Sequence, residues 1–265
     1  MTSRDRARRS LLLAALLACA PAGFAQDLPE IKKTGRLRVL AVPISEGPTF
    51  MSVRNPEDGF DAEILAGFAR LHGLQVEVVP VETWDGLVPA LTRGRGDVAA
   101  GGFTDTAARR AQIAFTVEVF PTRDVVLTRK PNPAVTTLDQ LRRLTVGTIT
   151  GTSMSDAVAA ARVARHDDTL PPGGVQAALR EGRVQAAVDG LESALVAARH
   201  DPEVQIGMFI GASQSLAYGV RKDAPLLRQA LDEYLANTRR SGTWNRLAVK
   251  YFGPAAPEIL RRAQK

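Results

Sequence analysis

The histidines and the single cysteine of this chain offer little chemistry, which leaves arginine and carboxylate side chains as the main candidates. His72, His166 and His200 are scattered near the ends of predicted helices and read as surface residues. They do not form a metal-binding set, because they are far apart in the sequence and match no metal-ligand spacing. Cys19 lies in the N-terminal segment discussed below, so the rest of the chain offers no disulfide, thiolate ligand or cysteine nucleophile.

Three polar residues have side chains that could bind a charged ligand. Arg109 can hold a carboxylate through two parallel hydrogen bonds, which a lysine cannot form. Since Arg110 follows directly, the two could instead be a solvated surface pair. Asp189 ends a predicted strand and could simply cap the helix that follows. Ser153 lies in a Gly-Thr-Ser turn at a helix start, where it could bind an anion or act only as a cap.

Residues 1–25 predict a secretory signal peptide, and hence export to the periplasm. Four arginines precede an apolar run from Leu11 to Ala20. Gly23 and Ala25 fit the small-residue positions of a cleavage site before Gln26. The apolar run is about half the ~20 residues that a bilayer-spanning helix needs, and no later run is long enough.

The same segment has two alternative interpretations. The run from Leu16 to Cys19 is similar to a lipobox, which would leave a lipoprotein anchored at Cys19, although leucine directly before the small residue fits poorly. The pair Arg8-Arg9 also permits a twin-arginine signal, but an ordinary basic start explains it as well.

Removal of the signal peptide leaves 240 residues and halves the formal net charge. The full chain has 34 Lys+Arg and 28 Asp+Glu, or +6; the remainder has 30 and 27, or +3. This charge gives no reason to expect a nucleic-acid partner. A chain of this length exceeds the commonest domain size and can bury a core without disulfides, so its length is compatible with two lobes.

Apolar runs alternate with segments of helical periodicity, which predicts an α/β fold with largely parallel sheets. Strands are expected at residues 37–42, 76–81, 97–101, 124–129, 145–150, 184–188, 204–210 and 216–221. Ligands of such sheets bind beyond the carboxyl ends of the strands, near helix N-termini. The loops after the first and third strands, and after the central strands of the second half, are therefore the places to expect a site.

The break Lys130-Pro131-Asn132-Pro133 separates two runs of this alternation. We expect one lobe from residues 34–126 plus 218–265 and a second lobe from residues 127–217. The chain would cross between them near Leu127 and Ala217. The expected architecture is two Rossmann-like lobes with mixed, mostly parallel sheets, joined by a two-segment hinge.

Short motifs occur along nearly the whole mature chain in the order found in one family. They are Gly35–Val39, Gly59-Phe60-Asp61, Trp84 with Leu87–Leu91, Gly94–Val98, Thr104–Arg109, Ala114-Phe115-Thr116, Gly182–Asp189 and Gly242-Thr243-Trp244. The set resembles the polar amino acid-binding type of bacterial extracellular solute-binding proteins, which are type II periplasmic binding proteins used by ABC transporters. Each motif is weak alone, whereas the ordered set is specific.

The resemblance implies a site for a free amino acid between the lobes. The family's carboxylate-binding arginine falls at Arg109, after a Thr-x-Thr loop. Thr104 and the backbone amides near Gly102 and Thr104 would add donors. Asp189 matches the acidic partner of the ammonium, and Ser153 matches the hydroxyl that meets the carboxylate from the second lobe.

Trp84 and Phe50 match positions where apolar or aromatic groups flank the ligand's side chain, although either could belong to the core. The sequence also departs from the family. Thr106–Arg109 keeps the arginine of the usual Thr-Pro-Glu-Arg but loses the usual helix start, and Gln185 replaces an acid. The usual Pro-Phe pair after the first strand is interrupted here as Pro48-Thr49-Phe50, and residues 43–50 lack the aspartate typical of basic-amino-acid binders. These departures leave the zwitterion site intact and its side-chain specificity open.

The implied function is capture of an amino acid or similar small zwitterion for delivery to the membrane permease of an ABC transporter. We expect a monomer with no cofactor, metal or catalytic residue. One rival is a cyclohexadienyl dehydratase-like enzyme, in which Glu192 would be a general acid; it could instead be a charge favoured by the helix N-terminus. Another is an accessory or sensory protein of the methanol-oxidation type, against which the retained Arg109 and Asp189 argue.

Overall fold

The computed structural model describes residues 27–44, 50–53, 58–254 and 256 of the 265-residue chain. The predicted signal peptide, its possible lipidation site Cys19, and Pro48 and Thr49 of the first loop lie outside the described residues. Within those ranges, no helix combines the length and the apolar character that a membrane crossing requires.

The first lobe is built on a five-stranded mixed sheet with the order β2-β1-β3-β10-β4. Strand β1 is parallel to β2 and β3, whereas β10 is antiparallel to both of its neighbours. The strands are β1 (Arg36–Ala41), β2 (Gln75–Pro80), β3 (Val98–Ala99), β4 (Ala114–Phe115) and β10 (Gly219–Val220). The helices are α1 (Leu28–Thr34), α2 (Phe60–Leu71), α3 (Trp84–Thr92), α4 (Ala107–Arg110), α9 (Pro225–Arg240) and α10 (Thr243–Phe252).

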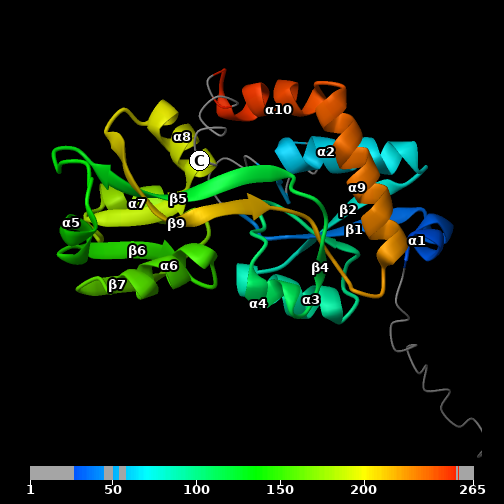
Figure 1. The fold of residues 1–265 in the computed structure, drawn as a ribbon, viewed down its shortest axis with the longest axis horizontal. Helices are drawn as coiled ribbons and strands as arrows, with labels where there is room; N and C mark the ends of the chain where they lie inside the picture. The colour runs from blue at the N-terminus through cyan, green and yellow to red at the C-terminus, as the bar shows by residue number, and fades with distance from the viewer. Residues whose placement is uncertain (1–26, 45–49, 54–57, 255, 257–265) are drawn as a thin grey trace, which may run out of the picture.

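The second lobe has its own five-stranded sheet with the order β7-β6-β8-β5-β9. Strands β6, β7 and β8 run parallel, and β5 is antiparallel to β8 and β9. The strands are β5 (Phe120–Arg129), β6 (Thr145–Ile149), β7 (Arg165–Leu170), β8 (Ala186–Gly190) and β9 (Val204–Leu216). The helices are α5 (Leu138–Arg142), α6 (Ser153–Ala161), α7 (Val175–Arg180) and α8 (Leu191–His200). The expected two-lobed α/β fold is confirmed (Figure 1).

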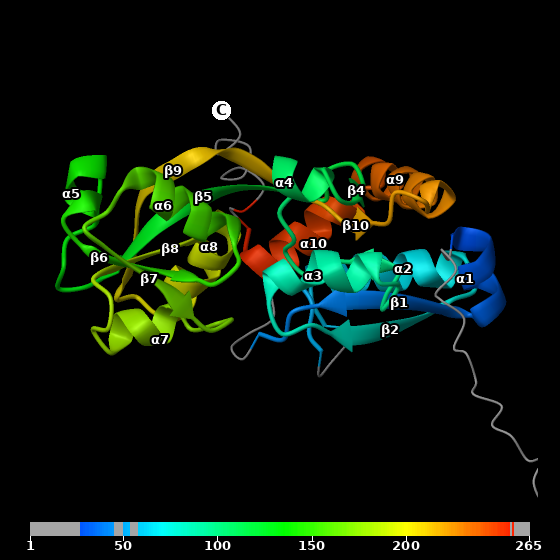
Figure 2. The same ribbon diagram turned by 90° about the horizontal axis from the view of Figure 1, so that it is seen from below.

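The chain enters the second sheet earlier than the predicted crossing at Leu127. Strand β5 pairs with β9 from Phe120↔Leu216 onward and with β8 from Asp124↔Gly190. Residues 120–126, which we assigned to the first lobe, therefore belong to the second sheet. The break at Lys130 marks the end of β5 and does not separate the lobes. The predicted crossing at Leu127 falls inside the buried run Val125 to Leu127, which contains no turn residue. The paired strands β5 and β9 span the two lobes (Figure 2).

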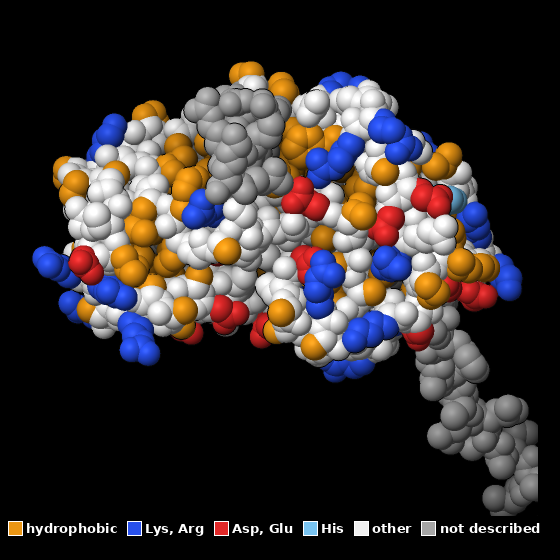
Figure 3. Space-filling model, in the orientation of Figure 1, with side chains coloured by type: hydrophobic (Ala, Val, Ile, Leu, Met, Phe, Trp, Pro, Cys, Tyr) orange, Lys and Arg blue, Asp and Glu red, His pale blue; other side chains and the backbone are white. Residues whose placement is uncertain are grey.

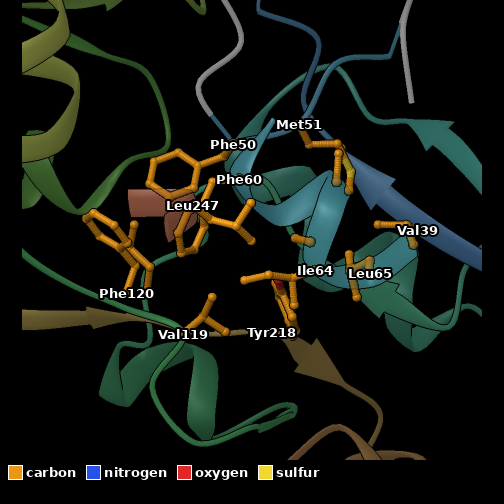
Figure 4. Close-up of a cluster of buried hydrophobic side chains, with 14 of the residues drawn as sticks. Val39, Phe50, Met51, Phe60, Ile64, Leu65, Val119, Phe120, Tyr218 and Leu247 are labelled. Carbon is orange, nitrogen blue, oxygen red and sulfur yellow. The ribbon is translucent and has the colours of Figure 1, made fainter. Parts of the chain in front are cut away.

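An aromatic cluster fixes the start of β5 against the first lobe (Figure 4). The ring of Phe120 lies 5.2 Å from Phe60 and 5.5 Å from Phe50, both edge-on. Phe252 of α10 packs at 4.7 Å from Phe120. Trp244 of α10 also donates its indole N–H to the carbonyl of Val119, at 2.6 Å. Helix α10 therefore holds the point where the chain leaves the first lobe.

Candidate ligand-binding cleft

A cavity of about 590 Å³ lies between the lobes, and all seven residues singled out in the sequence line it. The first lobe contributes Phe50, Trp84, Gly102, Thr104 and Arg109, and the second contributes Ser153 and Asp189. The remaining lining residues are Ile44, Gly101, Ile149, Thr152, Met154, Gly173, Val175, Gln176, Arg180, Val188, Glu192, Ser193, Val196, Ala197, His200 and Asp201. Residues far apart in the sequence thus meet at one site.

Helix α4 positions Arg109. The helix begins after Thr106, whose side chain accepts a hydrogen bond from the Arg109 N–H at 3.3 Å. A helix therefore still begins here, capped by the threonine, although Ala107 stands where the usual motif has its proline. The Arg109 guanidinium donates to the Thr104 carbonyl at 2.7 Å and to the Gly151 carbonyl of the other lobe at 3.4 Å. It also stacks 4.3 Å from the centre of the Phe103 ring.

The charge of Arg109 has only backbone carbonyls as hydrogen-bond partners within the described residues. Burial lowers its pKa to about 10, against the opposing attraction of Asp156 and Asp85. The guanidinium therefore remains cationic at neutral pH and available to an anion. Arg110 is different, since its exposed side chain forms an ion pair with Asp105. The two arginines are not a solvated surface pair.

Ser153 faces the first lobe across the cleft. Its hydroxyl donates to the Thr104 hydroxyl at 3.3 Å. The helix cap is Thr152, whose side chain accepts from the Ser155 N–H, so the interpretation of Ser153 as only a cap is wrong. The preceding Gly151 lies against Asp85 of α3, where a Cβ atom would come within 2.7 Å of the carboxylate. The lobes therefore contact each other next to Trp84 and Thr152, which line the cavity.

Asp189 stands at the end of β8 and does not cap α8. One of its carboxylate oxygens accepts from the Gly190 N–H at 2.8 Å, and Gly190 occupies the cap position without a side-chain bond. Burial raises the pKa of Asp189 to about 7; the Gly190 N–H opposes that shift, and neighbouring Asp124 adds to it. The carboxyl is therefore poised to gain a negative charge when a cation arrives.

Two further carboxyls lie behind Asp189. Glu192 is 3% exposed, accepts a hydrogen bond from the Thr122 hydroxyl, and lines the cavity. Burial, with added repulsion from Asp189 and Asp124, raises its pKa to about 8 although the Thr122 bond lowers it. Asp124 is fully buried; one oxygen accepts from the Gln214 amide at 2.9 Å and the other has no partner among the described residues. The sequence analysis missed Asp124, because only the pairing of β5 with β8 brings it there.

The Gly102 amide is not a free donor, contrary to expectation. It donates to Asp61 at 3.2 Å, and the Gly101 N–H donates to the same oxygen at 2.9 Å. The second oxygen of Asp61 accepts from the Tyr218 hydroxyl at 3.2 Å. Buried Asp61, with a pKa raised to about 6 by burial, therefore shapes the glycine loop from behind.

Two aromatic residues contribute to both core and cavity. Phe50 is 4% exposed and belongs mainly to the aromatic cluster, so it presents only part of its surface to the cavity. Its ring would lie 3.2 Å from a Cβ atom on Gly102, a tight contact, and the φ of 77° at Gly102 also favours glycine. Trp84 is half-buried at the start of α3 and packs against the first-lobe core while lining the cavity.

Metal and polyanion sites find little support in the described parts of the chain. No group of three or more His, Cys, Asp or Glu side chains in those parts is arranged to hold a metal ion. Over the described surface that Figure 3 shows, lysines and arginines are scattered among acidic side chains on both lobes. This face of the protein lacks the continuous basic patch that nucleic-acid binding would require.

Residues 39–254 match the family model described as bacterial extracellular solute-binding proteins, family 3. One relative is the membrane-bound lytic murein transglycosylase F of Pseudomonas putida (strain GB-1), 25% identical over 236 residues, covering 85% of this chain and 48% of the relative. Another is a probable histidine-binding protein of Campylobacter jejuni, 24% identical over 221 residues, covering 80% of this chain and 85% of the relative. The chain spans about half the length of the transglycosylase relatives it matches.

Similar solved structures cover the same part of the chain. A mutant of ArgBP from T. maritima is 26% identical with a TM-score of 0.77, covering 86% of this chain and 99% of that one. An ancestral amino acid-binding protein, described as a precursor of cyclohexadienyl dehydratase, is 25% identical with a TM-score of 0.76, covering 85% and 99%. An ancestral arginine-binding protein bound to arginine is 27% identical with a TM-score of 0.72, covering 83% and 99%.

Proposed function

This chain belongs to family 3 of the bacterial extracellular solute-binding proteins, and from that premise we propose that it captures an amino acid or similar small zwitterion between its lobes. One observation carries the proposal. The cationic Arg109 of the first lobe and the half-buried carboxyl of Asp189 in the second lobe line a single cavity. A free amino acid presents one carboxylate and one ammonium, which are complementary to these two groups.

The proposed binding mode assigns each end of the zwitterion to one lobe. The ligand carboxylate would take a bidentate hydrogen bond from Arg109, with the Thr104 and Ser153 hydroxyls at 3.3 Å from each other nearby. The ammonium would bind Asp189 and draw it into its ionised form. In each pair, ligand carboxylate with Arg109 and ligand ammonium with Asp189, the two charges lose water together. Their attraction then offsets the cost of desolvation. Binding would therefore hold the lobes closed.

We further propose export to the periplasm and delivery of the ligand to an ABC transporter permease, with the protein acting as a monomer and without a cofactor. The basic and apolar start of the sequence supports export. The family assignment and the similarity to a probable histidine-binding protein support a binding function.

A thermal-shift panel on the mature protein tests the proposal. The panel contains the common amino acids, opines and dicarboxylates, together with the 2-hydroxy acid and the amine that correspond to each amino acid. We expect at least one amino acid to raise the melting temperature more than either of its truncated analogues. A ligand at 100 times its Kd stabilises the fold by about 2.7 kcal/mol, which such an assay detects. If no zwitterion stabilises the protein and it instead captures a periplasmic oxidoreductase, the accessory-protein hypothesis replaces this one.

A second candidate function is an elimination reaction of the cyclohexadienyl dehydratase type. It is favoured by Glu192, a cavity-lining carboxyl that burial keeps protonated at neutral pH and that could donate its proton to a leaving hydroxyl. Incubation of the purified protein with prephenate or arogenate tests it. Turnover that disappears in Glu192→Gln would establish the enzyme, and the absence of turnover would reject it.

A further inference from the structure

The cavity extends well beyond the two groups proposed to hold a zwitterion. Along α8 its lining continues from Glu192 through Ser193, Val196 and Ala197 to His200. These residues recur at helical spacing and therefore share one face of the helix. At 1.5 Å per residue, Glu192 and His200 are separated by about 12 Å along the helix axis. This length exceeds what the carboxylate and ammonium of a free amino acid occupy.

Helix α7 also lines this extension. It contributes Val175, Gln176 and Arg180, and it packs on the same buried cluster as α8. Val175 and Ala197 are both buried, so the middle of the extension is apolar. The extension is therefore a groove with an apolar middle that leads from the carboxyl cluster to the outer ends of both helices.

Charged and titratable side chains stand at the outer end of the groove. Arg180 and His200 are exposed there, and Asp201 is the acidic neighbour. Asp201 is already paired with Arg129 in an ion pair. Arg180 itself forms no ion pair within the described residues, although its charge is close enough to help lower the pKa of Asp201. The groove thus begins at carboxyls and ends at a guanidinium that is available to an anion.

We propose that the ligand is an amino acid elongated through its side chain and ending in a second carboxylate that contacts Arg180. This inference rests on the proposed zwitterion site, because Arg109 and Asp189 occupy the α-carboxylate and the α-ammonium. The chain must therefore extend from the side chain, as it does in a γ-glutamyl peptide. An extended peptide spans about 3.3–3.6 Å per residue, so a γ-glutamyl tripeptide matches the length of the groove.

The test uses calorimetry with a matched pair of ligands and two variants. The ligands are γ-glutamylglycylglycine and the same tripeptide with its terminal carboxylate converted to an amide. The variants are Arg180→Gln and Arg199→Gln; Arg199 is also exposed and lies on α8, but it does not line the cavity. Because Arg180 is exposed, we expect wild type to prefer the carboxylate by up to about fivefold at low ionic strength, less with added salt. Arg180→Gln should abolish this preference and Arg199→Gln should retain it.

Other outcomes distinguish a failure of the elongated-ligand inference from a failure of the proposed function. The elongated-ligand inference fails if both tripeptides bind wild type equally, if the preference persists in Arg180→Gln, or if a free amino acid binds and neither tripeptide does. In those cases the proposed zwitterion site stands. If neither the tripeptides nor any free amino acid binds, the proposed function fails together with the inference.

Discussion

Replacement of Glu192 with glutamine should stabilise the unliganded protein at neutral pH and have little effect under acidic conditions. Burial raises the pKa of Glu192 from 4.5 to about 8, so between these values the folded state keeps a proton that the unfolded state has lost. The folded state then binds more protons, and stability falls as the pH rises. Within this window, each unit rise in pH lowers the free energy of unfolding by about 1.4 kcal/mol. At pH 7 the Glu192 carboxyl therefore lowers the free energy of unfolding by about 3 kcal/mol. Glutamine does not titrate and has no such effect.

Glutamine is a suitable replacement because it keeps the volume of the side chain and an oxygen that can accept from the Thr122 hydroxyl. The assay is urea denaturation of both proteins at pH 5, 6, 7 and 8 without ligand. The gain in the free energy of unfolding should grow steadily from pH 5 to pH 8. Glu181→Gln, at an exposed position, is the control and should stay within about 0.5 kcal/mol throughout. A difference independent of pH, or one that shrinks as the pH rises, would refute the reasoning.

Three further substitutions test the site and its support. Arg109→Ala should weaken amino acid binding roughly 30-fold to several thousand-fold in calorimetry, with Arg109→Lys recovering part and Arg110→Ala changing little; binding by Arg109→Ala within threefold of wild type would contradict the assigned role. Asp189→Ala should weaken an amino acid far more than its 2-hydroxy acid analogue, whereas equal losses would argue against ammonium binding. Asp61→Ala leaves three donors unpartnered, two of them fully buried, and should cost about 3 kcal/mol or more in urea denaturation, and Asp61→Asn less; similar stabilities of the two variants would contradict this.

The residues that could be located from the sequence are those placed by local pattern. Arg109 and Asp189 follow a loop and a strand whose order along the chain is readable, and both line the cavity. Asp124 could not be recognised, because its proximity to Asp189 depends on the antiparallel pairing of β5 with β8, which joins segments more than sixty positions apart. The hydrogen bond from the Gly102 amide to Asp61 likewise depends on how α2 packs against the loop after β3.

The crossing between the lobes shows the same limit. A proline-containing break after Arg129 suggested a boundary there, yet the aromatic contacts of Phe120 place the change of sheet earlier. Turn residues mark where a strand ends, but they do not show which sheet that strand joins. Long-range packing decides that point, and a single sequence contains no direct signal for it.

The close approach of Gly151 to Asp85 places this glycine at a point where the two lobes touch. Gly151 has a φ of 72°, and a Cβ atom there would lie 2.7 Å from the carboxylate of Asp85. Alanine at this position would strain its own backbone and wedge the halves apart, shifting the population toward open molecules without removing any group assigned to the ligand. Small-angle X-ray scattering of Gly151→Ala should then show a more expanded particle, and its apparent affinity should fall in proportion to the lost closed fraction. Scattering and affinity equal to wild type would show that the halves separate and meet without regard to this contact.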